Sequence, residues 1–147
     1  MRRLFFPNFV TGRGALGLVA VRAVTGLAFI FHGWGKIQQP FGWIDKIDPD
    51  MPGILQAAAA LAEFGGGAAL ILGFLTPLAA AGIGAIMAVA LAQVHLPQGH
   101  PFVAAPGEHS FELAAVYLSI MVLLFLTGPG ILSADAYLFG RGSHSRR

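Results

Sequence analysis

Four long apolar stretches, at about residues 15–37, 53–74, 77–96 and 111–127, limit what this 147-residue chain can fold into. A helix needs about 20 mainly apolar residues to cross about 30 Å of hydrocarbon, and about 17 can suffice. The stretches do not alternate apolar with polar residues, so a transmembrane β-barrel is disfavoured. We therefore predict an all-α fold, an integral membrane four-helix bundle with antiparallel up-down topology over residues 15–127.

The composition indicates lipid rather than water as the main solvent. The chain is 56% hydrophobic and only 11% charged, whereas about 25% of residues are charged in soluble domains. Cysteine is absent, which excludes a disulfide framework, thiolate metal ligands and an iron–sulfur cluster in this chain. Any redox chemistry must use a bound cofactor, nitrogen and oxygen ligands or a partner protein. The formal charge of +2 is modest and argues against nucleic-acid binding.

The connections between the apolar stretches predict how the helices follow one another. Only residues 73–77 join the second and third, and Gly73 followed by Pro77 fits a helix end and a helix start in a tight antiparallel hairpin. The longer loops, 38–52 and 97–110, then lie on one side of the membrane. Small residues such as Gly65, Gly66 and Gly67 allow helices to approach closely in lipid.

The basic residues lie mostly near the chain ends. They are Arg2, Arg3, Arg13, Arg141, Arg146 and Arg147. Because the two long loops contain only Lys46, the positive-inside rule predicts that both termini are cytoplasmic in a multi-pass protein of the cell inner membrane. Segment 1–14 mixes arginine with phenylalanine and is expected to be an interfacial anchor or a frayed cytoplasmic tail. Segment 128–147 is expected to be cytoplasmic.

Arg22 and Glu63 are charged residues at the predicted membrane depth. Counted from the expected helix starts, Arg22 lies roughly 10 Å from the inner edge and Glu63 roughly 15 Å from the outer edge, and we expect the two to pair. An unpaired charge there would cost at least about 2.5 to 3.5 kcal/mol. The pair can belong to a ligand pocket or proton path, or it can be an ion pair that fixes helix register.

Further polar residues follow towards the predicted outer end of the first helix. Arg22, Thr25, Phe29, His32 and Lys36 recur at three- and four-residue spacing and so share one face. Lys36 alone fits a snorkelling anchor. His32 is a candidate ligand-binding residue.

A second group of polar residues is expected at a similar outer depth. His109 and Glu112 can face one point if that turn is helical, and with His95 or His32 they offer a nitrogen-and-oxygen metal set. The same groups fit a quinone head group or another small ligand, and loop histidines are often only solvated. The sequence leaves these interpretations open.

The segment after the fourth stretch predicts a short helix. Residues 128–130 stop the preceding helix, and Ser133 can cap the next one. Asp135 then falls in its first turn, where a carboxylate suits the positive end of the helix dipole. Asp135 can also reach back towards Arg22.

The chain resembles the DoxX family of small bacterial and archaeal membrane proteins in three segments. They read RAVTGLAFIFHGWGK at 22–36, EFGGGAALILGFLTP at 63–77, and a stretch at 112–135 that includes Tyr117 and ends in GPGILSAD. The resemblance implies a four-helix membrane fold and a redox association, because some relatives are subunits of thiosulfate:quinone oxidoreductase and others belong to membrane oxidoreductase assemblies. The positions that match the family pattern are Arg22, His32, Gly33, Lys36, Glu63, Gly128 and Asp135.

Together these features predict an oxidoreductase subunit in the bilayer that supports electron transfer to or from the quinone pool. No flavin, nicotinamide or covalent-haem motif is evident, so another subunit of the complex would hold the primary redox centre. Quinone is a more favoured ligand than a metal, and no residue is assigned a catalytic role. The predicted ligand-binding or buried polar pocket comprises Arg22, His32, Lys36, Glu63, Glu112 and Asp135.

Two other functions compete with this interpretation. The first is an accessory subunit of a larger respiratory or photosynthetic assembly, with no chemistry of its own. The second is a permease for a small solute or metal. A permease is disfavoured because the third apolar stretch offers only Gln93 and His95, both at its outer end, to line a polar path.

Overall fold

The computed structural model describes residues 9–140, and the regular structure in this part of the chain is entirely helical. The elements are α2 (Gly12–Gln38), α3 (Gly53–Leu72), α4 (Thr76–Val89), η1 (Ala90–His95), α5 (Glu112–Thr127) and α6 (Ala134–Phe139). η1 is a π-helical stretch that continues α4. Most of the predicted interfacial anchor, and the arginines expected to set the orientation except Arg13, fall outside the described residues.

Three helices in the described chain are long and apolar enough to cross a membrane. They are α2 with 27 residues, α3 with 20, and α4 together with η1 over the 20 residues Thr76–His95. The fourth apolar helix, α5, has only 16 residues. Large apolar side chains such as Val24, Phe31 and Leu126 are exposed on the outside of these helices. These side chains are not buried inside the protein. An exposed apolar surface of this kind suits contact with lipid tails.

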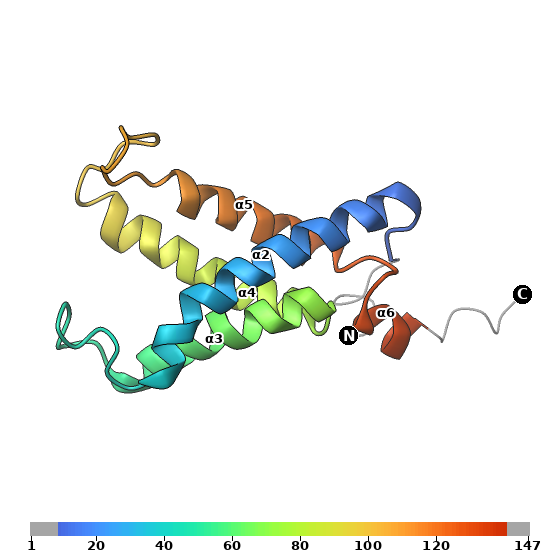
Figure 1. Cartoon of the computed structure of the whole chain (residues 1–147), viewed down its shortest axis with the longest axis horizontal. Coiled ribbons are helices and arrows are strands. Elements are labelled where there is room, and N and C mark those ends of the chain that lie inside the picture. Colours follow the sequence, from blue (N-terminus) through green and yellow to red (C-terminus); the bar gives the residue numbers. More distant parts are fainter. Residues whose placement is uncertain (1–8, 141–147) are drawn as a thin grey trace, which may run out of the picture.

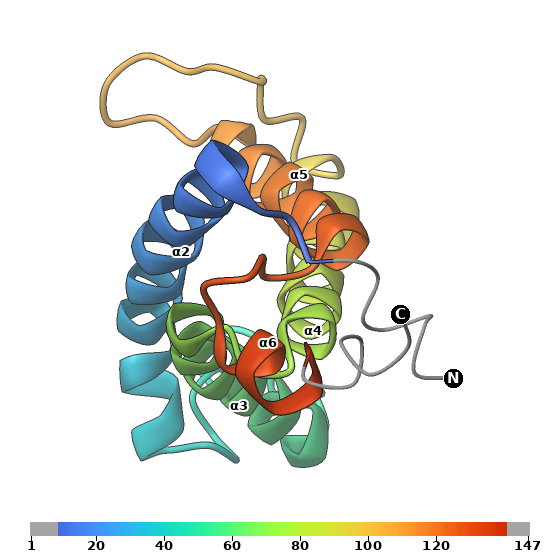
Figure 2. The same cartoon turned by 90° about the vertical axis from the view of Figure 1, so that its right-hand side faces the viewer.

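Successive helices turn back at two ends of the molecule (Figure 1). The start of α2, the α3–α4 turn and α6 lie at one end, called here the α6 end, and the loops 39–52 and 96–111 lie at the other, called the loop end. α2 contacts mainly α3, α5 contacts mainly α4, and α3 contacts α4. Viewed along the helices, α6 and the segment before it cross the α6 end (Figure 2). The C-terminal segment therefore ties together elements that are distant in sequence.

The contact between α2 and α3 depends on glycine. A Cβ atom at Gly26 would stand 2.5 Å from the Gly67 carbonyl oxygen, and one at Gly67 would stand 2.6 Å from the Gly26 carbonyl oxygen. Further along, a Cβ atom at Gly33 would stand 2.5 Å from the backbone nitrogen of Phe64. The two backbones thus touch at two places. Since lipid provides no hydrophobic drive for helix association, such close packing supplies dispersion contacts in its place.

The turn between α3 and α4 follows the predicted hairpin. α3 ends at Gly73 in the left-handed conformation, with φ of 65°, and Pro77 lies in the first turn of α4. Leu75 also has a positive φ, of 47°, which is unfavourable for a branched side chain. Residues of the C-terminal segment lie next to Leu75 and hold it in this conformation.

The Gly67→Ala substitution is expected to lower the free energy of unfolding by about 1–3 kcal/mol, because the added methyl group must push α2 and α3 apart. The measurement is helix unfolding by circular dichroism in mixed detergent micelles. Gly35→Ala is the matched control, since a Cβ atom there meets nothing within 4 Å. Equal stability of the two variants would show that the helices do not meet at Gly67.

Candidate functional site

The charged residues predicted to share one pocket separate into two groups. The predicted pairing of Arg22 with Glu63 is wrong, because Glu63 forms its ion pair with Lys36. The cause is the register of the two helices. With Gly26 against Gly67, Arg22 faces the end of α3 at Gly73. Arg22 and Lys36 are about 21 Å apart along α2, at 1.5 Å per residue over their sequence separation.

Arg22 is buried at the α6 end, with 2% of its surface exposed. Its Nη2 donates a hydrogen bond of 2.7 Å to the carbonyl oxygen of Leu132, and its Nη1 lies where a Cβ atom on Gly73 would be. Glycine at position 73 therefore has two roles. It adopts the left-handed conformation of the turn, and its lack of a side chain leaves space for the Arg22 guanidinium. Nε and Nη1 of Arg22 have no hydrogen-bond partner among the described residues.

Asp135 is fully buried and caps a helix other than its own. Its Oδ1 accepts a hydrogen bond of 2.7 Å from the Leu75 backbone nitrogen, and its Oδ2 accepts one of 3.0 Å from that of Thr76. The Asp135 backbone nitrogen also donates to the Gly73 carbonyl oxygen, at 2.9 Å. Ser133 caps α6, as predicted. The Asp135 carboxylate thus holds the positive φ of Leu75 and satisfies the first N–H groups of α4.

Lys36 and Glu63 form an ion pair near the loop end. Lys36 Nζ lies 2.6 Å from Glu63 Oε1, and the same Nζ stands 4.4 Å from the centre of the Trp43 ring. The Glu63 side chain is 2% exposed and the Lys36 side chain 25% exposed. Glu63 Oε2 is buried with no partner among the described residues. The ammonium group is therefore shared between a carboxylate and an aromatic face, which a snorkelling lysine would not be.

Gln56 is a buried polar residue that the sequence analysis did not single out. Its side chain donates to Asp45 Oδ1 at 2.6 Å and to the Met51 carbonyl oxygen at 3.1 Å, and accepts from the Ile44 backbone nitrogen at 3.3 Å. Trp43 Nε1 donates to the Gln56 carbonyl oxygen at 3.0 Å. These bonds fold the 39–52 loop over Lys36. The sequence does contain a signal for Gln56. It is a lone amide side chain on an apolar helix, and it lies seven residues before Glu63 and hence on the same face.

His32 lies on the outer surface of α2, next to an aromatic pair. Its ring is 5.8 Å from Phe29 and 6.4 Å from Tyr117 of α5, nearly edge-on to the tyrosine at 83°. Phe29 and Tyr117 are in direct ring contact at 5.0 Å. His32 is exposed whereas Phe29 is buried. The imidazole and the phenol hydroxyl make no hydrogen bond within residues 9–140, although both lie on helices surrounded by apolar side chains.

The predicted metal ligands are not brought together. Within the described chain, no group of three or more histidine, cysteine, aspartate or glutamate side chains is placed to hold a metal ion. His109 and Glu112 do not share a helical face, because α5 begins only at Glu112, which is exposed. His95 and His109 instead lie beside His100, and His32 lies against Tyr117. His100 was not predicted to belong to any site.

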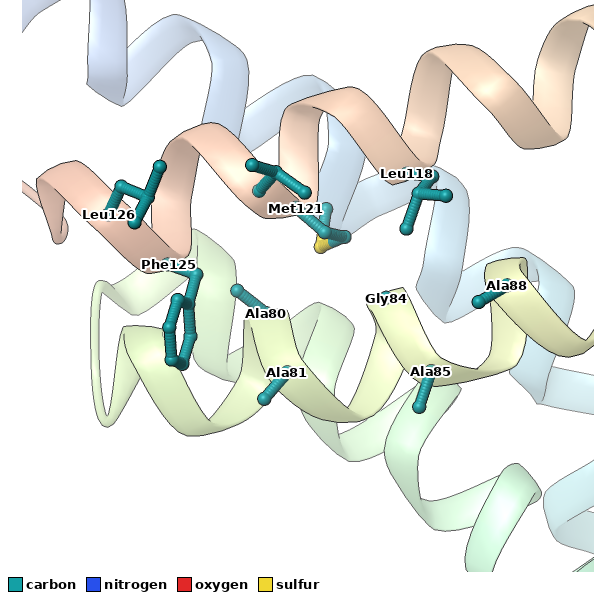
Figure 3. A pocket seen from close by; sticks show the side chains of 10 residues that line it. Ala80, Ala81, Gly84, Ala85, Ala88, Leu118, Met121, Phe125 and Leu126 are labelled. Carbon is teal, nitrogen blue, oxygen red and sulfur yellow. The ribbon is translucent and has the colours of Figure 1, made fainter.

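A groove between α4 and α5 has a volume of about 390 Å³ and is lined only by apolar residues. Small residues of α4, such as Ala80 and Gly84, form one wall, and larger side chains of α5, such as Leu118 and Phe125, form the other (Figure 3). It offers no hydrogen-bonding group that could orient a polar substrate. The polar candidates are thus His32 with Tyr117, and Lys36 with Glu63.

Comparison with known proteins gives a family match and a similar protein. The sequence profile of the DoxX family matches residues 17–96, more than half of the chain. The chain belongs to the DoxX family. It is also similar to the inner membrane protein YqjF of Escherichia coli (strain K12), with 29% identity over 124 residues, which cover 84% of this chain and 92% of that protein. No solved structure shows significant similarity. The chain is thus a DoxX membrane protein.

Lys36→Met is expected to lower the free energy of unfolding by about 3–5 kcal/mol, because it leaves the buried Glu63 carboxylate without its counter-ion. Glu63→Gln should cost less, since the partly exposed Lys36 can still reach polar surroundings. The double variant should recover most of the stability lost in Lys36→Met. Unfolding in mixed micelles measures all three. Equal losses in the two single variants would contradict this asymmetry.

Asp135→Ala is expected to destabilise the fold by about 2–5 kcal/mol, because one buried and one part-buried backbone N–H group of the α3–α4 turn lose their acceptor. Glu108→Ala removes an exposed loop carboxylate and is the control, with an expected effect within about 0.5 kcal/mol. Protection of the α4 amides against hydrogen exchange reports the change. Unchanged protection in Asp135→Ala would mean that α4 does not need this cap.

Proposed function

We propose that this protein is the membrane subunit of a quinone-linked redox complex, and that a quinone head group binds beside His32 and Tyr117. One observation carries the proposal. An exposed imidazole and a half-buried phenol lie together on a helix surface that is otherwise apolar, with their ring centroids 6.4 Å apart. Polar groups inside a membrane are costly unless they serve a ligand or a path, so this pair needs an explanation.

The chemistry of the pair fits a quinone. The quinone ring is flat and apolar and carries two carbonyl oxygens that accept hydrogen bonds. The His32 imidazole and the Tyr117 hydroxyl can each donate one, and the half-buried Tyr117 ring, backed by the buried Phe29 ring at 5.0 Å, supplies an aromatic surface. A ligand dissolved in the bilayer reaches this surface from the side, without a channel through the helices.

The Lys36–Glu63 pair is suited to a supporting role in the same site. Lys36 follows His32 by one helical turn, so the ion pair lies at a nearby depth. The buried Glu63 Oε2, which has no partner among the described residues, can accept a hydrogen bond from a polar group that enters beside Lys36. Arg22 and Asp135, at the opposite end, are assigned to fold stability and not to the ligand site. Glu112, the exposed first residue of α5, is not assigned to this site.

We further propose that α2, α3, α4 with η1, and α5 all cross the bilayer as an antiparallel four-helix bundle with both termini in the cytoplasm. The three candidate spans and the placement of α5 along α4 support this arrangement. The similarity to an Escherichia coli inner membrane protein supports location in the cell inner membrane. The loop end would then face the outside, and the quinone site would lie in the outer leaflet.

A second candidate is an accessory subunit that only assembles with others. The apolar groove between α4 and α5 favours it, because a helix of another subunit can cover the small residues there. The two functions differ in one respect. Only the first requires a bound quinone that depends on His32.

The test is the amount of quinone retained per chain after gentle purification into nanodiscs from the native membrane, measured by extraction and mass spectrometry. His32→Leu should lower retention about tenfold, which corresponds to about 1.4 kcal/mol, roughly the loss of one hydrogen bond. Ser119→Ala, an exposed position on α5 whose hydroxyl bonds only to its own helix, should retain quinone like the unmodified protein.

Quinone at the level of bulk lipid, or equal retention in His32→Leu and Ser119→Ala, would refute the quinone site. If the same preparation then contained a stoichiometric set of other subunits, the accessory function would take its place. A stoichiometric partner that carries flavin, haem or a metal centre, together with His32-dependent quinone, would support the proposal in full.

A further inference from the structure

Three imidazoles gather at the loop end, apart from the His32 and Tyr117 pair. His95 is the last residue of η1, His100 lies in the following loop, and His109 lies just before α5. The Nδ1 atoms of His95 and His100 are 3.0 Å apart. The rings of His100 and His109 are stacked, with centroids 5.2 Å apart and an interplanar angle of 23°. The three side chains thus join the two ends of the 96–111 loop.

We propose that His95, His100 and His109 form a proton-sensitive clasp that keeps the 96–111 loop closed at neutral pH and releases it on acidification. This function goes beyond the quinone site and does not depend on it. The loop is the part of the protein that would respond, and the stimulus is the proton concentration on the side of the membrane that the loop faces.

The contact between the Nδ1 atoms of His95 and His100 needs one hydrogen atom between the two nitrogens and not two. A hydrogen bond between two Nδ1 atoms requires an N–H on one ring and a lone pair on the other. When one ring is protonated the bond survives, because the imidazolium Nδ1–H can donate to the Nδ1 lone pair of the neutral ring. When both rings are protonated each Nδ1 is a donor, so the bond is lost and two positive rings face each other. Protonation of His109 sets a further positive charge against the stacked His100 ring. Protonation of the whole cluster therefore opens the clasp.

Few other contacts hold the loop, so the clasp matters to its closure. His100 donates its backbone N–H to the His95 carbonyl oxygen at 3.1 Å, and Phe111 donates to Pro101 at 3.1 Å. The Phe102 and Phe111 rings lie 5.3 Å apart. Most other loop residues are exposed.

The electrostatic surroundings give the direction of the response. Partial burial, followed by the neighbouring His109 and His95, lowers the pKa of the His100 imidazole. Glu108 and Glu112, the carboxylates nearest in the chain, are exposed and make no ion pair within residues 9–140. The closed loop thus binds fewer protons than the open loop. Closure is complete above the open-state pKa of about 6.5 and is lost as pH falls below it.

The first experiment is nitrogen-15 NMR of the histidine side chains in the full chain, in nanodiscs of phosphatidylcholine. The His100 imidazole should titrate below about 6.5, the value of an unperturbed histidine. His95→Gln should move this titration upward, because it removes one neighbouring imidazole. Titration of His100 at or above about 6.5, or no change in His95→Gln, would overturn the proposal.

The second experiment is hydrogen exchange of the loop at pH 7.5 and pH 5.0, corrected for the intrinsic effect of pH on exchange. Protection over residues 97–111 should fall about tenfold at the lower pH, because protonated imidazoles favour the open loop. His100→Gln should show equal protection at both pH values. Gln98→Ala, an exposed loop position that does not titrate, should respond like the unmodified protein.

The 39–52 loop serves as an internal control, because it contains no histidine. Its protection should not change between the two pH values. Equal protection of residues 97–111 at both pH values would overturn the clasp. An unchanged pH response in His100→Gln would overturn it as well. Loss of quinone from His32→Leu has no bearing on either result.

Discussion

The contact of the α2 and α3 backbones at Gly26, Gly33 and Gly67 sets the positions of the other elements. Two helices that touch without intervening side chains cannot slide past each other by a residue without a clash. This register brings Arg22 to the end of α3 and Lys36 to Glu63. Arg22 thereby obtains the Leu132 carbonyl oxygen as a partner, and Lys36 and Glu63 obtain each other. A looser contact would leave several registers of similar energy, and in some of them one charge would face lipid.

The two ends of the molecule use polar residues for different purposes. At the α6 end, Arg22 and Asp135 bind backbone groups of the C-terminal segment and of the α3–α4 turn, and both are nearly inaccessible. Their bonds close the end of the fold around a leucine with positive φ. At the loop end, Lys36 stays partly exposed, and His32 lies on the surface. Exchange of protons or ligands is open only to the second group.

Much of the fold follows from the sequence, because its signals are local. Apolar length marks the helices, Gly73 and Pro77 mark the hairpin, and Ser133 marks the start of α6. The Arg22–Glu63 pairing failed because depth counted from helix starts ignores register, which depends on where glycines on two helices meet. The role of Asp135 was also out of reach, since its acceptor atoms serve N–H groups 59 and 60 residues away.

The histidine side chains show the same limit of prediction from sequence for the candidate site. His95 and His109 were expected near the surface, but His100 joins them only because the loop folds back on itself. Tyr117 was noted as a family match, yet its contact with His32 depends on how α5 lies across α2. Spacing along one helix predicts which residues share a face. It does not predict which face of another helix they meet.

The length of α5 has a consequence for the surrounding lipid. Its 16 residues span about 24 Å, whereas the hydrocarbon layer is about 30 Å thick and α2 is long enough to cross it with a tilt. If α5 crosses the bilayer, the layer beside it must thin, or flanking residues must extend the apolar surface. Thinning on one side of the molecule would favour association with other short helices there, since two short helices that share one thinned region deform less lipid than two separate ones. Hydrophobic mismatch can thus gather subunits beside α5 even where no side chain recognises its partner.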